Sequence, residues 1–228
     1  MAGNALRGLA AMLASGLMIF QQAVDTAAPQ NADGALLLVN RSWRISSEYY
    51  PETRVSHVPG QVRRLRPEAA QALEAMFSAC REETGVILVS VSGYRDYEKQ
   101  ERIYRHKLEN VRGNVEKADA YVARPGASEH QTGLSMDVGA RKEDKKTLEP
   151  TFGGTKGGMW LKENCWRFGF ILRYDEGWEE TTGYAYEPWH VRYVGPEHAA
   201  AIHEHSMPLE DYLKLLRQET LLELVSAD

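Results

Sequence analysis

Helix-like and strand-like segments alternate irregularly along this chain, and that order most restricts its fold. Apolar residues recur every three or four positions over residues 67–80, which predicts a helix that Gly85 ends. The β-branched run at residues 86–92 predicts a buried strand directly afterwards. Because no βαβ unit repeats at a regular length, we expect an α+β fold: a single domain with a small, mostly antiparallel sheet flanked by helices.

Shorter patterns complete this picture. Asp96 is suited to cap the start of a helix over residues 96–109. Pro188 lies inside the strand-like run at residues 186–194, and a proline in a strand indicates an edge or a bulge. A bulge would bring Glu187 and His190 onto one side. Strands are also predicted at residues 34–40, 134–138 and 170–174, helices at 115–122, 159–168, 196–205 and 209–225, an extended arm at 41–64, and a loop or flap at 139–158.

The composition is that of an ordinary globular protein. The chain has 228 residues, of which 43% are apolar and 26% charged, so it can bury one sizeable core. Its net charge is −5 and no stretch is rich in Lys or Arg. A nucleic-acid partner is therefore not expected.

The first 33 residues differ from the rest. A positive charge at Arg7, an apolar run at residues 9–20 and small residues after it follow the order of a secretory signal. The apolar run is short for a membrane span. We expect residues 1–33 to be a signal-like segment and linker, cleaved or retained, and residues 34–228 to be the folded domain of a protein exported to the cell envelope or beyond, with no stable membrane span besides this segment. A disordered or amphipathic extension is the alternative.

The two cysteines fall on apolar faces of predicted helices. Cys80 and Cys165 are expected to be buried free thiols, since neither belongs to a Cys-x-x-Cys pair. Export would permit a disulfide, and the sequence alone leaves that pairing open.

Four polar residues have the types that zinc hydrolysis requires. A catalytic zinc site needs three protein ligands and an open position, and a carboxylate that is not a ligand must accept the proton of the attacking water. His130 and Asp137 lie in the stretch "SEHQTGLSMD", and Glu187 and His190 in "EPWH". We take His130, Asp137 and His190 as candidate ligands and Glu187 as the candidate base. By spacing alone a solvated loop histidine is the commoner explanation, and the helical His-Glu-x-x-His motif is absent.

The order of several motifs is more specific. "SEHQTGLSMD" is similar to Ser-x-His-x-x-Gly-x-Ala-x-Asp, "EPWH" to Glu-x-x-His, and "SGYRDYEKQ", "FGFILRY" and "TGYAYEPWHVRYVG" complete the set in order. Together they resemble the VanY-type D-alanyl-D-alanine carboxypeptidases, zinc peptidases related to the VanX dipeptidases. The resemblance extends from about residue 36 to about residue 216, with Ser135 in place of the usual alanine.

This resemblance implies roles for individual residues. His130, Asp137 and His190 match the zinc ligands, in a cleft of the fold, and Glu187 matches the general base. Arg95 matches an arginine that faces the substrate's oxyanion or its terminal carboxylate, Ser128 matches a substrate-binding serine, and Gln100 is a further candidate on the same side. Without a substrate role, Arg95 would cap a strand end or pair with an acid, and Ser128 would cap the loop.

The implied activity is removal of the C-terminal D-amino acid from peptidoglycan stem peptides with Zn²⁺ as cofactor. Three related activities stay open: L,D-carboxypeptidase, D-Ala-D-Ala dipeptidase, and cleavage of the L-Ala-D-Glu bond. A metal-containing module that binds peptidoglycan without cleaving it is the non-enzymatic alternative. Such a structural site needs no base, which Glu187 would provide.

Overall fold

The computed structural model describes residues 34–141 and 148–226. The predicted signal-like segment at residues 1–33 lies outside these described residues, as does part of the predicted flap, residues 142–147. No helix in the described part of the chain is both long and apolar enough to span a membrane.

A four-stranded sheet forms the centre of the fold. Its strand order is β3 (Leu88–Ser92), β4 (Ser135–Ala140), β6 (His190–Tyr193), β5 (Phe170–Leu172), and every neighbouring pair is antiparallel. All six residues of β4 are buried. The predicted α+β domain with a small antiparallel sheet is confirmed.

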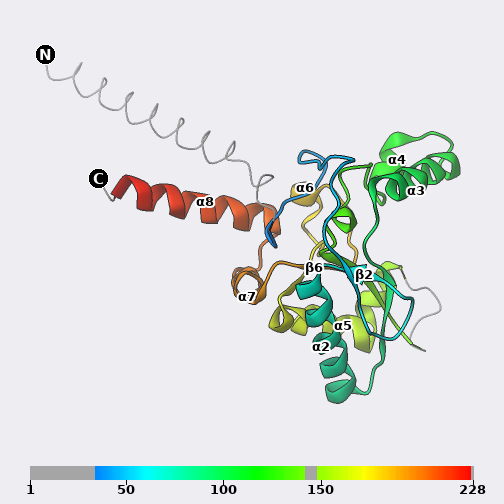
Figure 1. Ribbon diagram of the computed structural model, residues 1–228, viewed down its shortest axis with the longest axis horizontal. Helices are drawn as coiled ribbons and strands as arrows, with labels where there is room; N and C mark the ends of the chain where they lie inside the picture. Colours follow the sequence, from blue (N-terminus) through cyan, green and yellow to red (C-terminus); the bar gives the residue numbers. More distant parts are fainter. Residues whose placement is uncertain (1–33, 142–147, 227–228) are drawn as a thin grey trace, which may run out of the picture.

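Helices cover the sheet and extend from both ends of the molecule (Figure 1). Helix α2 (Pro67–Thr84) and helix α5 (Lys156–Asn164) contribute to the main apolar core together with β3 and β4. A second cluster joins β5 to α7 (Pro196–His205) and to the start of α8 (Leu209–Ser226). Helix α8 extends away at one end, while α3 (Tyr97–Asn110) and α4 (Val115–Asp119) form the other end (Figure 1). The remaining elements are β1 (Arg54–Val55), β2 (Arg64–Leu65), α6 (Glu179–Thr182) and the 3₁₀ turns η2 (Glu129–Thr132), η3 (Pro150–Gly154) and η4 (Cys165–Phe168).

The helix boundaries follow the sequence signals closely. Gly85 adopts φ 76° at the end of α2, a left-handed conformation that glycine enters without steric cost. The side chain of Asp96 accepts a hydrogen bond from the backbone N–H of Lys99, as expected of an N-cap. Cys80 and Cys165 are buried and form no disulfide, so the predicted buried thiols are confirmed.

Two strand predictions were wrong. Residues 34–40 form no strand. Leu37 and Leu38 are buried, but the carbonyls of Ala35 and Leu37 accept hydrogen bonds from the guanidinium of Arg192, at 2.9 and 2.6 Å, instead of from a neighbouring strand. Strand β6 begins only at His190, so the predicted strand at residues 186–194 is shorter and contains no bulge at Pro188. The arm at residues 41–64 is largely irregular, as expected, although β1 and β2 pair within this part of the chain.

Candidate metal centre and its pocket

The sheet brings the three predicted ligands together. Asp137 lies in the middle of β4 and faces His190, the first residue of β6, in the antiparallel register. Directly opposed residues project side chains on the same face of a sheet. His130 comes from η2, which Gly133 at φ 71° joins to β4. One ligand atom from each of the three buried residues lies within 4.8 Å of the other two.

Each histidine ring has one nitrogen facing the cluster and one facing an outer partner. His130 Nδ1 lies 2.8 Å from the carbonyl of Gly93, and its Nε2 lies 3.3 Å from Asp137 Oδ2. His190 Nδ1 lies 3.0 Å from Asp137 Oδ1, and its Nε2 lies 3.3 Å from Glu129 Oε2. Because the outer partners are acceptors, they can hold a proton on each outer nitrogen when a metal occupies the centre, which leaves the inner nitrogens to bind it. Two imidazoles and a carboxylate with such outer hydrogen bonds fit Zn²⁺.

The charges around the cluster differ between its members. Burial, followed by the nearby charge of Arg95, lowers the pKa of His130 to about 4. Burial would also lower the pKa of His190, but hydrogen bonds to Asp137 and Glu129 raise it to about 9. Burial opposes ionisation of Asp137, yet the two imidazoles hold its pKa well below the usual range. Without a metal and at neutral pH, the Asp137 carboxylate is therefore ionised and His190 is a cation with protons on both ring nitrogens.

Glu187 reaches the cluster through a turn. The backbone N–H of His190 donates to the Glu187 carbonyl at 3.0 Å, and the Glu187 N–H donates to the Tyr174 carbonyl at 2.9 Å. This turn, and not the expected bulge, places the Glu187 and His190 side chains in one pocket. Burial, with the charge of Asp137 adding to it, raises the pKa of Glu187 to about 8. Glu187 is thus a buried carboxylate beside the three candidate ligands but outside their set.

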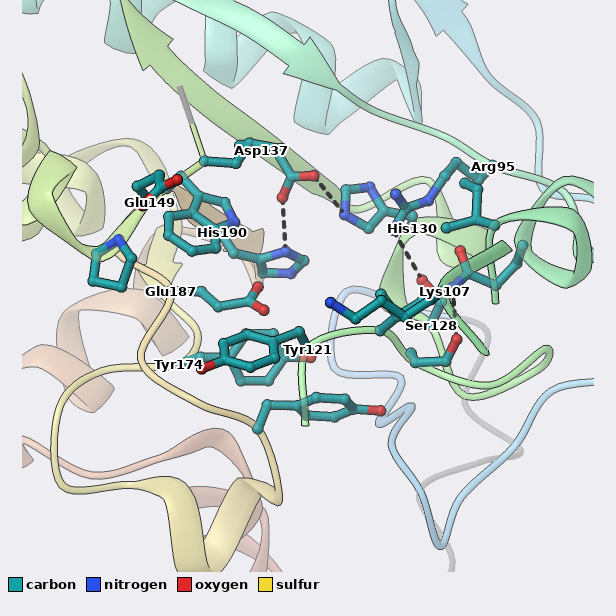
Figure 2. A pocket seen from close by; sticks show the side chains of 18 residues that line it. Arg95, Lys107, Tyr121, Ser128, His130, Asp137, Glu149, Tyr174, Glu187 and His190 are labelled. Atoms are coloured by element: carbon teal, nitrogen blue, oxygen red, sulfur yellow. Dashed lines mark hydrogen bonds and ion pairs between the residues drawn. The ribbon is translucent and has the colours of Figure 1, made fainter. Parts of the chain in front are cut away.

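One cavity joins all the predicted site residues. Its volume is about 570 Å³, and its wall includes the metal cluster, Glu187, Arg95, Ser128 and Gln100. Figure 2 shows Glu187 and Arg95 on either side of the His130–His190 pair. The wall also contains Ile103, Lys107, Tyr121, Val122, Ala123, Leu148, Glu149, Pro150, Tyr174, Tyr184 and Trp189. A cavity of this size accommodates a short peptide segment.

Arg95 and its neighbours keep hydrogen-bonding capacity for a ligand. The guanidinium lies 3.5 Å from Ser128 Oγ and 3.4 Å from Ser92 Oγ, both long contacts. Gln100 donates from Nε2 to the carbonyl of Ala123 at 2.7 Å. Within the described ranges, the buried atoms Arg95 Nε and Gln100 Oε1 have no hydrogen-bond partner. Buried polar groups are normally satisfied, so these two atoms keep unused capacity for a hydrogen bond to a group in the cavity.

Several residues at the site were not predicted. Glu129 lies behind His190 and contacts Arg173 and Arg192, and the ring of Tyr174 lies 4.9 Å from that of His190. Glu129 was within reach of the sequence, because it stands between Ser128 and His130 in the quoted motif. Its partners come from distant strands and gave no local signal.

The fold and the site together define a class of protein. A buried His₂Asp cluster that shares a peptide-sized cavity with a carboxylate outside the ligand set is the arrangement of a metal-dependent hydrolase. Residues 62–196 match the family model VanY, described as D-alanyl-D-alanine carboxypeptidase. The chain belongs to the VanY family and is a metallo-carboxypeptidase of that family, with a site that fits zinc.

Relatives of known name are similar over most of the chain. The putative carboxypeptidase YodJ of Bacillus subtilis (strain 168) is 39% identical over 198 residues, which are 83% of this chain and 70% of that protein. The structure of the LdcB LD-carboxypeptidase matches with a TM-score of 0.73 at 39% identity, over 82% of this chain and 87% of LdcB. A variant of the vancomycin-resistance D,D-pentapeptidase VanY, solved in complex with Zn(II), matches with a TM-score of 0.67 at 36% identity, over 78% and 98% of the two chains.

Proposed function

We propose that this chain is a zinc-dependent D,D-carboxypeptidase that removes the C-terminal D-amino acid from peptidoglycan stem peptides. One observation carries the proposal. The His130–Asp137–His190 cluster lines a 570 Å³ cavity whose wall also holds the buried carboxylate of Glu187 and the partly buried guanidinium of Arg95, whose Nε has no hydrogen-bond partner among the described residues.

Each group of the cavity has a defined task in this reaction. Zinc held by the three ligands would polarise the scissile carbonyl and lower the pKa of water toward neutrality. Glu187 accepts a proton from the water as it attacks the carbonyl carbon, and returns it to the amine of the departing D-amino acid. A purely structural metal site would have no use for this buried carboxylate.

Arg95 and Ser128 recognise the end of the substrate. An exopeptidase must bind a free terminal carboxylate, and a guanidinium offers a planar fork of donors for it. Because the contact between Arg95 and Ser128 is long, at 3.5 Å, a carboxylate can take up donors from both residues. Gln100 lines the same cavity and its Oε1 has no partner within the described residues, which supports a role as acceptor for a substrate N–H.

An L,D-carboxypeptidase is the second candidate. It is favoured by the similarity to LdcB, named as an LD-carboxypeptidase, at a TM-score of 0.73. The two activities differ in the residue before the scissile bond, which is D-alanine in one case and an L-diamino acid in the other. The chemistry assigned to Glu187 and Arg95 serves both.

A panel of stem peptides analysed by mass spectrometry tests the proposal. We expect a pentapeptide ending in D-Ala-D-Ala to lose one alanine, and a tetrapeptide ending in a single D-Ala to stay intact. Cleavage of the tetrapeptide alone would establish the L,D-activity. Cleavage of free D-Ala-D-Ala alone would indicate a dipeptidase, and a cut at L-Ala-D-Glu an endopeptidase. If no peptide is cleaved while zinc and peptidoglycan bind, the chain is a binding module.

Export completes the proposal. Stem peptides mature outside the cytoplasmic membrane, and a signal-like segment at residues 1–33 would take the domain to them. Fractionation of cells that produce the full chain should recover it in the envelope or the medium. Recovery in the cytoplasm alone would exclude this localisation.

A further inference from the structure

A fully buried carboxylate lies behind one metal ligand. Glu129 is 1% exposed, and its Oε2 lies 3.3 Å from His190 Nε2, the ring nitrogen that faces away from Asp137. Ser135 donates to the same oxygen at 3.2 Å. The cavity described above does not include Glu129 in its wall, so this carboxylate is not placed to meet a substrate.

The other oxygen of Glu129 is held by two arginines. Arg173 donates from Nε to Glu129 Oε1 at 2.8 Å, and Arg192 donates from Nη1 to the same atom at 2.8 Å. Both arginines are 0% exposed. The two oxygens therefore have different roles: Oε1 pairs with the cations, and Oε2 faces the imidazole.

Each arginine is in turn fixed from its far side. Arg173 makes a two-pronged ion pair with Glu210 at the start of α8, at 2.6 and 2.9 Å. Arg192 donates to the carbonyls of Ala35 and Leu37, at 2.9 and 2.6 Å. A buried set of charges of this kind is a poor source of stability, because apolar residues of similar volume commonly serve as well or better. Its position behind a metal ligand therefore calls for a functional explanation.

We propose that Glu129 is a positioning residue for the metal centre: it holds the proton of His190 on Nε2 and fixes the plane of the ring, so that Nδ1 presents its lone pair to the metal. The proposal rests on His190 being a metal ligand, as the proposed function requires. Arg173 and Arg192 keep Glu129 in place, and they are themselves held by Glu210 and by the carbonyls of Ala35 and Leu37.

Glutamine at position 129 gives a sharp test because the structure determines how its amide must lie. The two arginines donate to the Oε1 position, so the amide oxygen of Glu129→Gln must occupy it. The amide NH₂ then faces His190 Nε2 and donates to it. That hydrogen bond favours the opposite tautomer, with the proton on Nδ1, where the metal must bind.

Glu210→Gln is the matched control. It removes one negative charge from the same buried network and weakens the same arginine, Arg173, but it has no contact with His190. A purely structural role for the network predicts that both variants lower the melting temperature and leave zinc affinity alike. A positioning role predicts that only the change at Glu129 weakens zinc binding.

The experiment measures the zinc dissociation constant of each full-length protein by competition with a chromophoric chelator, next to thermal melting. We expect Glu129→Gln to weaken zinc binding by about 10- to 100-fold, the usual effect of removing an outer partner of a metal-bound histidine. Glu210→Gln should stay within about threefold of the wild type, well below that range. In zinc-loaded, ¹⁵N-histidine-labelled protein, the downfield Nε2–H signal of His190 should be present in the wild type and in Glu210→Gln and lost in Glu129→Gln.

Equal zinc affinities for the two variants, or an unchanged Nε2–H signal in Glu129→Gln, would overturn the proposal. Should Glu129→Gln fail to fold, Glu129→Asp replaces it: it retains the charge for the arginines but withdraws the carboxylate by about 1.5 Å, one carbon–carbon bond. Wild-type zinc affinity in that variant would also overturn it. These measurements use no peptide, so a chain that binds zinc as expected but cleaves no stem peptide would refute the proposed activity and leave this inference standing.

Discussion

Replacing Glu187 by glutamine should abolish most of the turnover while leaving the metal in place. The change preserves the shape of the side chain and removes only its ability to accept a proton. General-base catalysis contributes about 10²–10⁴ in rate, which corresponds to roughly 2.7–5.4 kcal/mol at 1.36 kcal/mol per factor of ten.

The surroundings of Glu187 point to the upper part of that range. Asp137 is engaged by both imidazoles, and Glu129 is held by two arginines, so neither carboxylate can replace the base. Glu187 is 8% exposed, which also restricts access of bulk buffer that might accept the proton. We therefore expect kcat to fall by about 10³–10⁴.

The assay follows release of D-alanine from a pentapeptide ending in D-Ala-D-Ala, with zinc content measured on the same samples. Glu149→Gln is the control, because Glu149 lines the same cavity but is not part of the metal cluster. It should keep kcat within about tenfold of the wild type, below the range for a lost general base. If Glu187→Gln loses its zinc, Glu187 is a ligand and not the base; if it retains more than a tenth of wild-type kcat, the proton goes elsewhere.

Three further predictions concern the substrate, the proton balance and the thiols. Arg95→Ala should raise KM and lower kcat by up to about 10²–10³, and the wild type should cleave C-terminally amidated peptides poorly. Wild-type values of kcat and KM in Arg95→Ala would show that Arg95 has only a structural role. Since the pKa of His190 is about 9 and that of Glu187 about 8 in the metal-free site, zinc binding at pH 7 should release at least one proton and weaken by at least about tenfold per unit as the pH falls; calorimetry in buffers of different ionisation enthalpy measures this, and zinc binding without proton release would contradict the assigned charges. Cys80 and Cys165 should resist thiol reagents in the native state and both react in denaturant, because they are buried and form no disulfide, and burial raises the pKa of Cys165 to about 12; a lack of reaction in denaturant without reductant would reveal a disulfide.

The regular spacing of apolar residues predicted the long helices and the central strand well, because these elements bury their apolar residues in the core. Helix α2 has one apolar face, a proline at its start and a glycine after its end, so three independent signals agree. The strand β4 was equally clear, and its identification placed Asp137 in the sheet core.

The segments that were predicted wrongly depend on partners distant in the chain. Residues 34–40 are apolar enough for a strand, but Arg192 takes up the carbonyls that a strand would pair. The turn at Glu187 depends on a backbone hydrogen bond from the first residue of β6, which alternation of side chains does not report. A local pattern cannot distinguish these cases.

The candidate site also contains both residues that sequence motifs identify and residues that depend on distant partners. The metal cluster was predictable because several motifs in the same order resemble those of a known family; the spacing of the single residues would not have identified it. The support behind it was not: Glu129, Arg173, Arg192 and Glu210 come from separate parts of the chain, and each on its own is an ordinary charged residue. Only the folded arrangement of the sheet and α8 shows that these four residues form one network of contacts.

Diffraction data collected at the zinc absorption edge from zinc-loaded crystals test the central claim most directly. The account predicts a single strong anomalous peak about 2.0–2.2 Å from His130 Nε2, a carboxylate oxygen of Asp137 and His190 Nδ1, with Glu187 outside the coordination sphere. A peak elsewhere, coordination by Glu187, or ligation through His190 Nε2 would contradict it.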